Sequence, residues 1–319
     1  MWQKWLGIMC LTHIIITLLN LHERVFNFLA QETIRLEILQ QFPLHYCISS
    51  VTTLKDEVFL LGKRDGQCHT ITVYDRSNMA EVKDVIPLPR LRAKIVAACS
   101  VSNYLYVLSS KRHRCSIVRV GKDGEHWSAV TPLISGIYLE EPTLSVTDSG
   151  SLITSGQQTS NDLPVISVWD ANGSMQREIR FSEDFSEVIS FFWHIIPKSN
   201  GNLVLAVADG PNRLMEINLD GIVIRQYDFM FLSLDYKCVT SYADRHGRIF
   251  NINYFKEMEL FDAEFNRIDF TGPELPPESG GHYFSPEDMH YNCARNELVA
   301  IVCNQDGKGV LVFFHFTGI

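Results

Sequence analysis

Three short basic segments between residues 63 and 114 carry the residue types best suited to bind an anion. They are Lys63 and Arg64, then Arg90, Arg92 and Lys94, and then Lys111, Arg112 and Arg114. Clustered lysine and arginine side chains bind phosphates and carboxylates, so these residues predict a site for an acidic peptide of a protein partner or for RNA. The alternative is a set of solvated loops, partly neutralised by Asp65. Few aromatic residues lie among them, which weakens the case for single-stranded RNA.

Acidic residues follow the basic segments in the sequence. Glu140 and Glu141 are adjacent, and a second acidic group contains Glu183, Asp184 and Glu187. The two groups indicate either a face with two charged halves or an ordinary solvated edge. Ion pairs that bury Arg112 and Arg114 against Glu140 and Glu141 would remove the predicted anion site.

His194, directly after Trp193, is the residue that most resembles a catalytic base. The alternative is a packed or hydrogen-bonded histidine, and we treat both residues as secondary binding candidates. The sequence has no Gly-x-Ser-x-Gly elbow, phosphate-binding P-loop or His-Glu-x-x-His zinc motif. It therefore favours a scaffold that binds a protein partner, without a cofactor, over an enzyme.

Composition excludes a global attraction to polyanions. The 319 residues carry 37 acidic and 28 basic side chains, for a net charge of −9, and 46% are hydrophobic. A chain of this kind builds a large core but is not drawn as a whole to nucleic acid or anionic membrane. The eight cysteines form no Cys-x-x-Cys pair, and most lie in apolar runs, which indicates buried thiols and a cytoplasmic protein.

Residues 1–31 form a hydrophobic N-terminal segment that is distinct from the rest. Residues 5–21 are almost wholly apolar, Lys4 precedes them, and no small-residue cleavage site follows. Three interpretations stay open: a packed helix, a membrane anchor or a secretory signal. The last two would place the protein at a membrane or outside the cell.

The remainder of the chain, residues 32–319, is built from an internal repeat. Short apolar runs recur at 58–61, 105–108, 152–154, 203–206, 249–252 and 298–301, each after a polar turn. The residues just before these runs are 47, 47, 51, 46 and 49 positions apart. A second series lies at 72–75, 118–121, 167–170, 215–218, 259–262 and 312–315. Six β-rich units at one period predict a radial or solenoidal β architecture.

Each unit has room for four antiparallel strands, which is the content of a β-propeller blade. The sixth unit ends after its third strand, whereas residues 32–39 alternate apolar and polar side chains before the first unit. We therefore predict an all-β, six-bladed propeller in which residues 34–39 pair beside residues 310–314 and close the ring. In such blades the loops after the second and fourth strands share one face, so the three basic segments are predicted to lie together.

The fourth unit carries a family resemblance. Its residues Gly201-Asn202-Leu203-Val204 and Asn212-Arg213, ending in Asp220-Gly221, resemble the NHL-type repeat of invertebrate NHL-like propellers. The resemblance implies protein or RNA binding on one face of a disc. It is looser in the first, second and sixth units, which lack the aspartate that ends the second strand of that repeat.

More distantly, the lactonase and esterase propellers hold a divalent metal at the axis with carboxylate and asparagine ligands. The resemblance to them implies Glu141, Asp209, Asn253 and Asp288 as ligands if a metal is present. The spacing of these four residues differs from unit to unit and no family motif surrounds them. We therefore expect no metal, and keep a metal-dependent hydrolase as an alternative.

Overall fold

A computed structural model describes most of the chain after residue 33. The described ranges are 34–44, 47–63, 68–88, 92–160, 163–181, 191–208, 213–228, 240–243, 247–252, 258–268, 270–271, 285–292, 295–303 and 309–317. Every regular element in these ranges is a β-strand, which confirms the predicted all-β class. The hydrophobic segment 1–31 lies outside them. Among the described ranges, no helix has the length and apolar character needed to cross a membrane.

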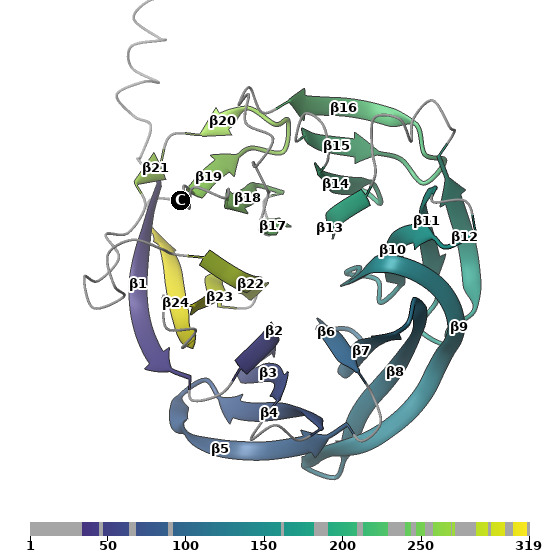
Figure 1. The fold of residues 1–319 in the computed structure, drawn as a ribbon. Coiled ribbons are helices and arrows are strands. Elements are labelled where there is room, and N and C mark those ends of the chain that lie inside the picture. Colours follow the sequence, from purple (N-terminus) through teal and green to yellow (C-terminus); the bar gives the residue numbers. More distant parts are fainter. Residues whose placement is uncertain are drawn as a thin grey trace, which may run out of the picture.

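The strands form sheets that stand around a common axis in a propeller-like ring (Figure 1). The first sheet contains, from the axis outward, β2 (Cys47–Leu54), β3 (Glu57–Lys63), β4 (His69–Asp75) and β5 (Asn78–Pro87). Two further four-stranded sheets have the same order. They contain β13 (Phe191–Pro197), β14 (Leu203–Ala208), β15 (Arg213–Ile217) and β16 (Val223–Asp228), and β17 (Thr240–Ala243), β18 (Ile249–Ile252), β19 (Met258–Phe261) and β20 (Arg267–Ile268).

One sheet is larger than the sequence predicts, because a single long strand takes part in two groups. The sheet holds β6 (Ala93–Cys99), β7 (Tyr104–Lys111), β8 (Arg114–Asp123), β9 (His126–Val146), β10 (Leu152–Gln158), β11 (Pro164–Trp169) and β12 (Met175–Arg180). The first part of β9 pairs with β8, from Asp123↔His126 to Arg114↔Tyr138, and its last part pairs with β10. The strand therefore runs from the rim to the axis without a break (Figure 1).

The two ends of the described chain meet in one sheet. It contains β22 (Ser285–Asn292), β23 (Glu297–Cys303), β24 (Gly309–Thr317), β1 (Ile34–Pro43) and β21 (Phe270–Thr271). The antiparallel register of β1 and β24 runs from Arg35↔Thr317 to Pro43↔Val310. The predicted pairing of the N-terminal strand with the last strand is confirmed, and it extends beyond the residues expected from the sequence. This ladder covers an edge of β24 that would otherwise be exposed.

The predicted periodicity is matched strand by strand. Each of the six apolar runs in the first series falls in a second strand of its group, and each run in the second series falls in or overlaps a third strand. These central strands are the most apolar because neighbouring sheets cover both of their faces. The core consequently lies between sheets, as where Phe59 and Trp127 meet edge to face with ring centroids 5.1 Å apart.

Closure by β1 makes a testable prediction about stability. Leu36 is 2% exposed and packs with Phe250, Tyr291 and Phe316, whereas Leu39 on the same strand is 46% exposed. We expect Leu36→Ala to lower the free energy of unfolding by about 2–5 kcal/mol because it leaves a cavity at the closure. Leu39→Ala is the matched control and should cost no more than about 0.5 kcal/mol. Urea denaturation measures both, and equal effects would contradict a structural role for β1.

Candidate functional site

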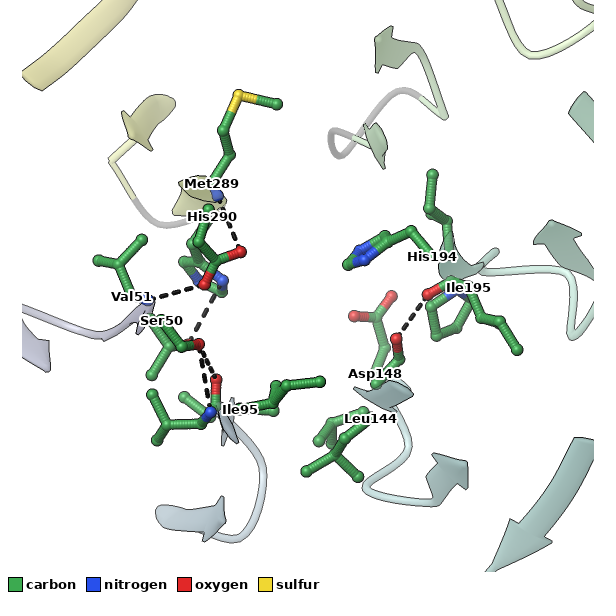
Figure 2. A pocket seen from close by; sticks show the side chains of 18 of the residues that line it. Ser50, Val51, Ile95, Leu144, Asp148, His194, Ile195, Met289 and His290 are labelled. Atoms are coloured by element: carbon green, nitrogen blue, oxygen red, sulfur yellow. Dashed lines mark hydrogen bonds between the residues drawn. The ribbon is translucent and has the colours of Figure 1, made fainter. Parts of the chain in front are cut away.

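A cavity of about 330 Å³ lies where the innermost strands face one another. Its walls come from β2, β6, the last part of β9, β13 and β22, so sequence segments far apart converge on it (Figure 2). Such a cavity at the centre of a rigid ring is the usual kind of place for a ligand to bind.

The five strands that form the cavity walls share a local irregularity that orients their side chains. Each shifts register against its second strand, at Ile48/Ser50, Ala93/Ile95, Phe192/His194 and Pro286/Asp288, and β9 does so opposite Ser155/Gln157. Register shifts of this kind redirect side chains. The first residues after the shifts occupy equivalent positions around the ring, and they are Ser50, Ile95, Thr143, His194 and Asp288.

Polar side chains near this level join three pairs of neighbouring sheets. The Val51 amide donates to Asp288 Oδ2 at 2.8 Å, which links β2 to β22. The Val96 amide donates to Ser50 Oγ at 3.2 Å, which links β6 to β2. The Ser145 hydroxyl donates to the Ile195 carbonyl oxygen at 2.5 Å, which links the last part of β9 to β13. The cavity wall is therefore held by side-chain-to-backbone hydrogen bonds between sheets.

The ionisable groups of the cavity have shifted pKa values. Burial raises the pKa of Asp288 to about 6, although hydrogen bonds from the Val51 amide, the Ser50 hydroxyl and the Met289 amide act in the opposite direction. Burial lowers the pKa of His194 to about 4 and that of His290 to about 4, and for His290 the neighbouring His194 adds to the effect. Both imidazoles are therefore neutral at neutral pH, and His290 Nδ1 lies 3.4 Å from Thr52 Oγ1.

The third basic segment forms the tight turn between β7 and β8. Lys111 pairs with Arg114, and the two central residues, Arg112 and His113, have φ angles of 50° and 65°. Positive φ at both central positions is the geometry of a two-residue hairpin turn that usually holds Asn-Gly. All four side chains are exposed, so the turn displays its cations to solvent.

The structure describes three of the other five predicted basic residues. Lys63 is exposed at the end of β3, Arg92 is exposed just before β6, and Lys94 is exposed within β6. Arg64 and Arg90 lie outside the described residues. Within the described ranges, Arg112 and Arg114 form no ion pair with Glu140 or Glu141, which is the pairing that would have removed the predicted anion site. Glu140 Oε1 instead lies 3.1 Å from His113 Nδ1, while the second acidic group, 183–187, is outside the described ranges.

The four metal candidates are not assembled among the residues that can be placed. Asp288 lines the cavity, but Glu141 is exposed on β9 and is not part of the lining. Asp209 and Asn253 fall outside the described ranges. Within those ranges no three histidine, cysteine, aspartate or glutamate side chains lie close enough together to hold a metal ion.

Sequence reasoning identified some of the residues that line the cavity and missed others. His194 lines it as expected for a residue near the axis, and Trp193 lies in β13 at the register shift, with a side chain outside the described set. Ser50, Thr52 and His290 were not singled out. Their signal was positional, because aligning the first strands of the repeats places Ser50 beside Asp288 and Thr52 beside His290.

The sequence matches no family model and no curated protein. A gluconolactonase from Xanthomonas campestris has a TM-score of 0.58 and 13% identity, over 91% of this chain and 92% of that one. A chain of the nidogen/laminin complex has a TM-score of 0.50 and 14% identity, over 76% and 81%. Hydrazine synthase from Kuenenia stuttgartiensis has a TM-score of 0.53 and 12% identity, over 82% and 78%. The fold is a β-propeller. At these identities the likeness carries the fold alone.

The shifted pKa values of the propeller's axis predict a pH dependence of its stability. The pKa of each histidine falls from 6.5 to about 4, so the stability that depends on the neutral rings is present above pH 6.5 and is lost as the pH falls towards 4. We expect His194→Gln with His290→Gln to remove this loss, which amounts to at most about 3.5 kcal/mol per histidine. Free energies of unfolding in urea between about pH 4 and 7.5 measure it.

Asp288 is the internal control for that measurement, because its contribution to stability changes with pH in the opposite direction. Its pKa rises from 3.8 to about 6, so its contribution is present below pH 3.8 and is lost as the pH rises through 6. Asp288→Asn should steepen the acid loss of the wild type rather than remove it. Parallel pH curves for the wild type and the double histidine variant would contradict the assignment.

Proposed function

We propose that this β-propeller is a non-enzymatic binding scaffold that holds an acidic segment of a protein partner. The proposed contact surface, called the basic patch below, consists of the described members of the three basic segments: Lys63, Arg92, Lys94, Lys111, Arg112 and Arg114. Arg64 and Arg90 complete it in the proposal.

The observation that carries the proposal is the absence of partners for these cations. Within the described part of the chain, none of the six forms an ion pair. Nine other described lysines and arginines do pair with carboxylates, and they are Arg76, Lys83, Lys122, Arg177, Arg180, Lys198, Arg225, Arg267 and Arg295. Cations left unpaired together are available to an external anion.

Strand pairing supports placing the patch at one end of the ring. Lys63 pairs with Cys47 at the start of β2, and Ala93 at the start of β6 pairs with Ser109 close to the β7–β8 turn. The hydrogen bond between Val96 and Ser50 brings β2 and β6 side by side. The innermost strands of a propeller run in the same direction, so the starts of β2 and β6 lie on the same face of the ring.

The proposal also includes finer features of the fold and setting. We count six blades, by dividing β9 between the second and third groups, and assign the repeat to the NHL type on residues 201–221.

A protein partner is favoured over RNA because few aromatic side chains accompany the cations, and a related fold occurs in the complex of nidogen with laminin. Cys68, Cys99 and Cys115 are free thiols, which supports a reducing compartment such as the cytoplasm.

Charge reversal tests the patch directly. We expect Arg112→Glu with Arg114→Glu to weaken binding of a poly-glutamate peptide by tenfold or more, since each lost cation contributes on the order of 1 kcal/mol at low salt. Arg35→Glu with Lys55→Glu is the charge-matched control, because these side chains are also exposed and form no ion pair within the described ranges. Fluorescence anisotropy at two salt concentrations measures both.

The choice between partners follows from the same assay. A single-stranded RNA of equal length serves as the competing probe, and tighter binding of the RNA through the same arginines would overturn the protein-partner assignment. Equal losses in the patch and control variants would indicate net charge alone.

The strained β7–β8 turn offers a second test that separates stability from binding. Arg112→Asn with His113→Gly suits the positive φ angles and should stabilise the fold by about 1–2 kcal/mol. The exposed His113–Glu140 contact that is lost contributes less than about 1 kcal/mol. Peptide binding should nevertheless weaken because Arg112 is gone. His113→Gly alone is the control, which should gain stability and keep binding. Full binding by the double variant would exclude Arg112 from the patch.

A further inference from the structure

We propose that the axial cavity binds a small organic cation, namely a protonated amine or amidinium group on a short apolar body. The Asp288 carboxylate is the anchoring group, and apolar side chains around it hold the body. This site is separate from the basic patch and does not depend on the proposed function.

The size and walls of the cavity suit such a ligand. Its volume of about 330 Å³ lies at the small end of the range of about 300–1,000 Å³ that is typical of ligand pockets. The apolar part of the lining includes Ile95, Ala97, Leu144, Ile196 and Met289. Burial of an apolar body against these side chains makes the free energy of binding more favourable, while the few polar groups set the orientation of the ligand.

The charges around the cavity favour a cation. Among the described lining residues, Asp288 and His290 come from β22, His194 from β13, Asp148 from the turn after β9 and Lys198 from the turn after β13. The lining from β2 and β6 adds no ionisable side chain.

Lys198 does not neutralise the carboxylates of Asp288 and Asp148, because its ammonium group is bound to other acceptors. Its ammonium group donates to Glu216 Oε2 at 3.0 Å and to the Ala263 carbonyl at 3.1 Å, and Glu216 is 1% exposed. Glu216 also pairs with Arg225 at 3.1 Å, so this group of two cations and one glutamate carries one positive charge. The two carboxylates of Asp288 and Asp148 outweigh it and leave one negative charge in excess. An anionic ligand would be repelled from the same space.

The Asp288 carboxylate retains capacity to bind a donor. Oδ2 accepts the Val51 amide at 2.8 Å, Oδ1 accepts the Met289 amide at 2.9 Å, and the Ser50 hydroxyl is a third donor. An ionised carboxylate offers about four lone-pair sites, so one stays available. In the described part of the chain Asp288 has no ion pair. Figure 2 shows His194 directed across the cavity from the side of Ile195 towards that of Met289 and His290. The polar and charged groups therefore converge on one level of an otherwise apolar space.

Three nearly isosteric probes of different charge test the proposal: benzamidinium, benzamide and benzoate. Isothermal titration calorimetry on the full chain at neutral pH should detect binding of benzamidinium only. Asp288→Asn should weaken that binding about tenfold or more, because a hydrogen-bonded charge pair is replaced by a neutral contact. Binding of benzamide or benzoate as tight as that of benzamidinium would overturn the proposal. So would the absence of benzamidinium binding up to about 10 mM.

Two further variants keep the test decisive. Ala97→Phe places a ring in the cavity and should abolish binding, and Asp148→Asn, at an exposed turn, should weaken it by a smaller factor. Arg112→Ala in the basic patch is the control that should bind benzamidinium like the wild type. Thermal unfolding shows that each variant is folded. If Asp288→Asn does not fold, the combined result of Ala97→Phe and Asp148→Asn decides, and unchanged binding in both overturns the proposal.

Discussion

Hydrogen bonds between neighbouring sheets, made near the axis, fix how the innermost strands of this propeller are spaced. The inner edge of each sheet exposes backbone groups that its own ladder does not use, and buried groups of this kind need partners. Asp288 satisfies the Val51 amide, Ser50 the Val96 amide and Ser145 the Ile195 carbonyl. The same contacts that fix the spacing of the sheets therefore also shape the cavity, so stability and any ligand binding at Asp288 are linked.

A second set of contacts joins the sheets farther from the axis through buried glutamates. Burial alone raises the pKa of Glu57, but hydrogen bonds from Lys83, Trp127 and Lys122 outweigh it and leave the pKa below its usual value. Glu297 holds Arg76 at 3.0 Å across the first and last sheets, where the ring closes. The cations at these joints are bound within the fold, whereas in the described part of the chain the lysine and arginines of the β7–β8 turn have no carboxylate partner and face solvent.

The candidate site was predictable only in pieces. The basic segments are visible in the sequence, and their exposure follows from the positions of the hairpin turns. His194 and Asp288 are visible as isolated polar residues, and only an alignment of the first strands of the repeats indicates that they occupy equivalent positions around the ring. The register shifts that orient them arise within hairpins of consecutive strands, but the convergence of these side chains on one cavity requires strands of different sheets to meet.

The sequence by itself determined the strands and their order. A period near 48 residues, turns before each apolar run and an alternating N-terminal strand were enough to predict the β1–β24 closure, because each repeat must bury both faces against its neighbours. Only the tertiary structure decided that β9 is continuous from rim to axis. It alone brought Asp288, His194 and His290 to one cavity. The reason is physical: local pattern sets which residues form strands, whereas the charge and solvent environment of a side chain depends on sheets that meet only after the ring has closed.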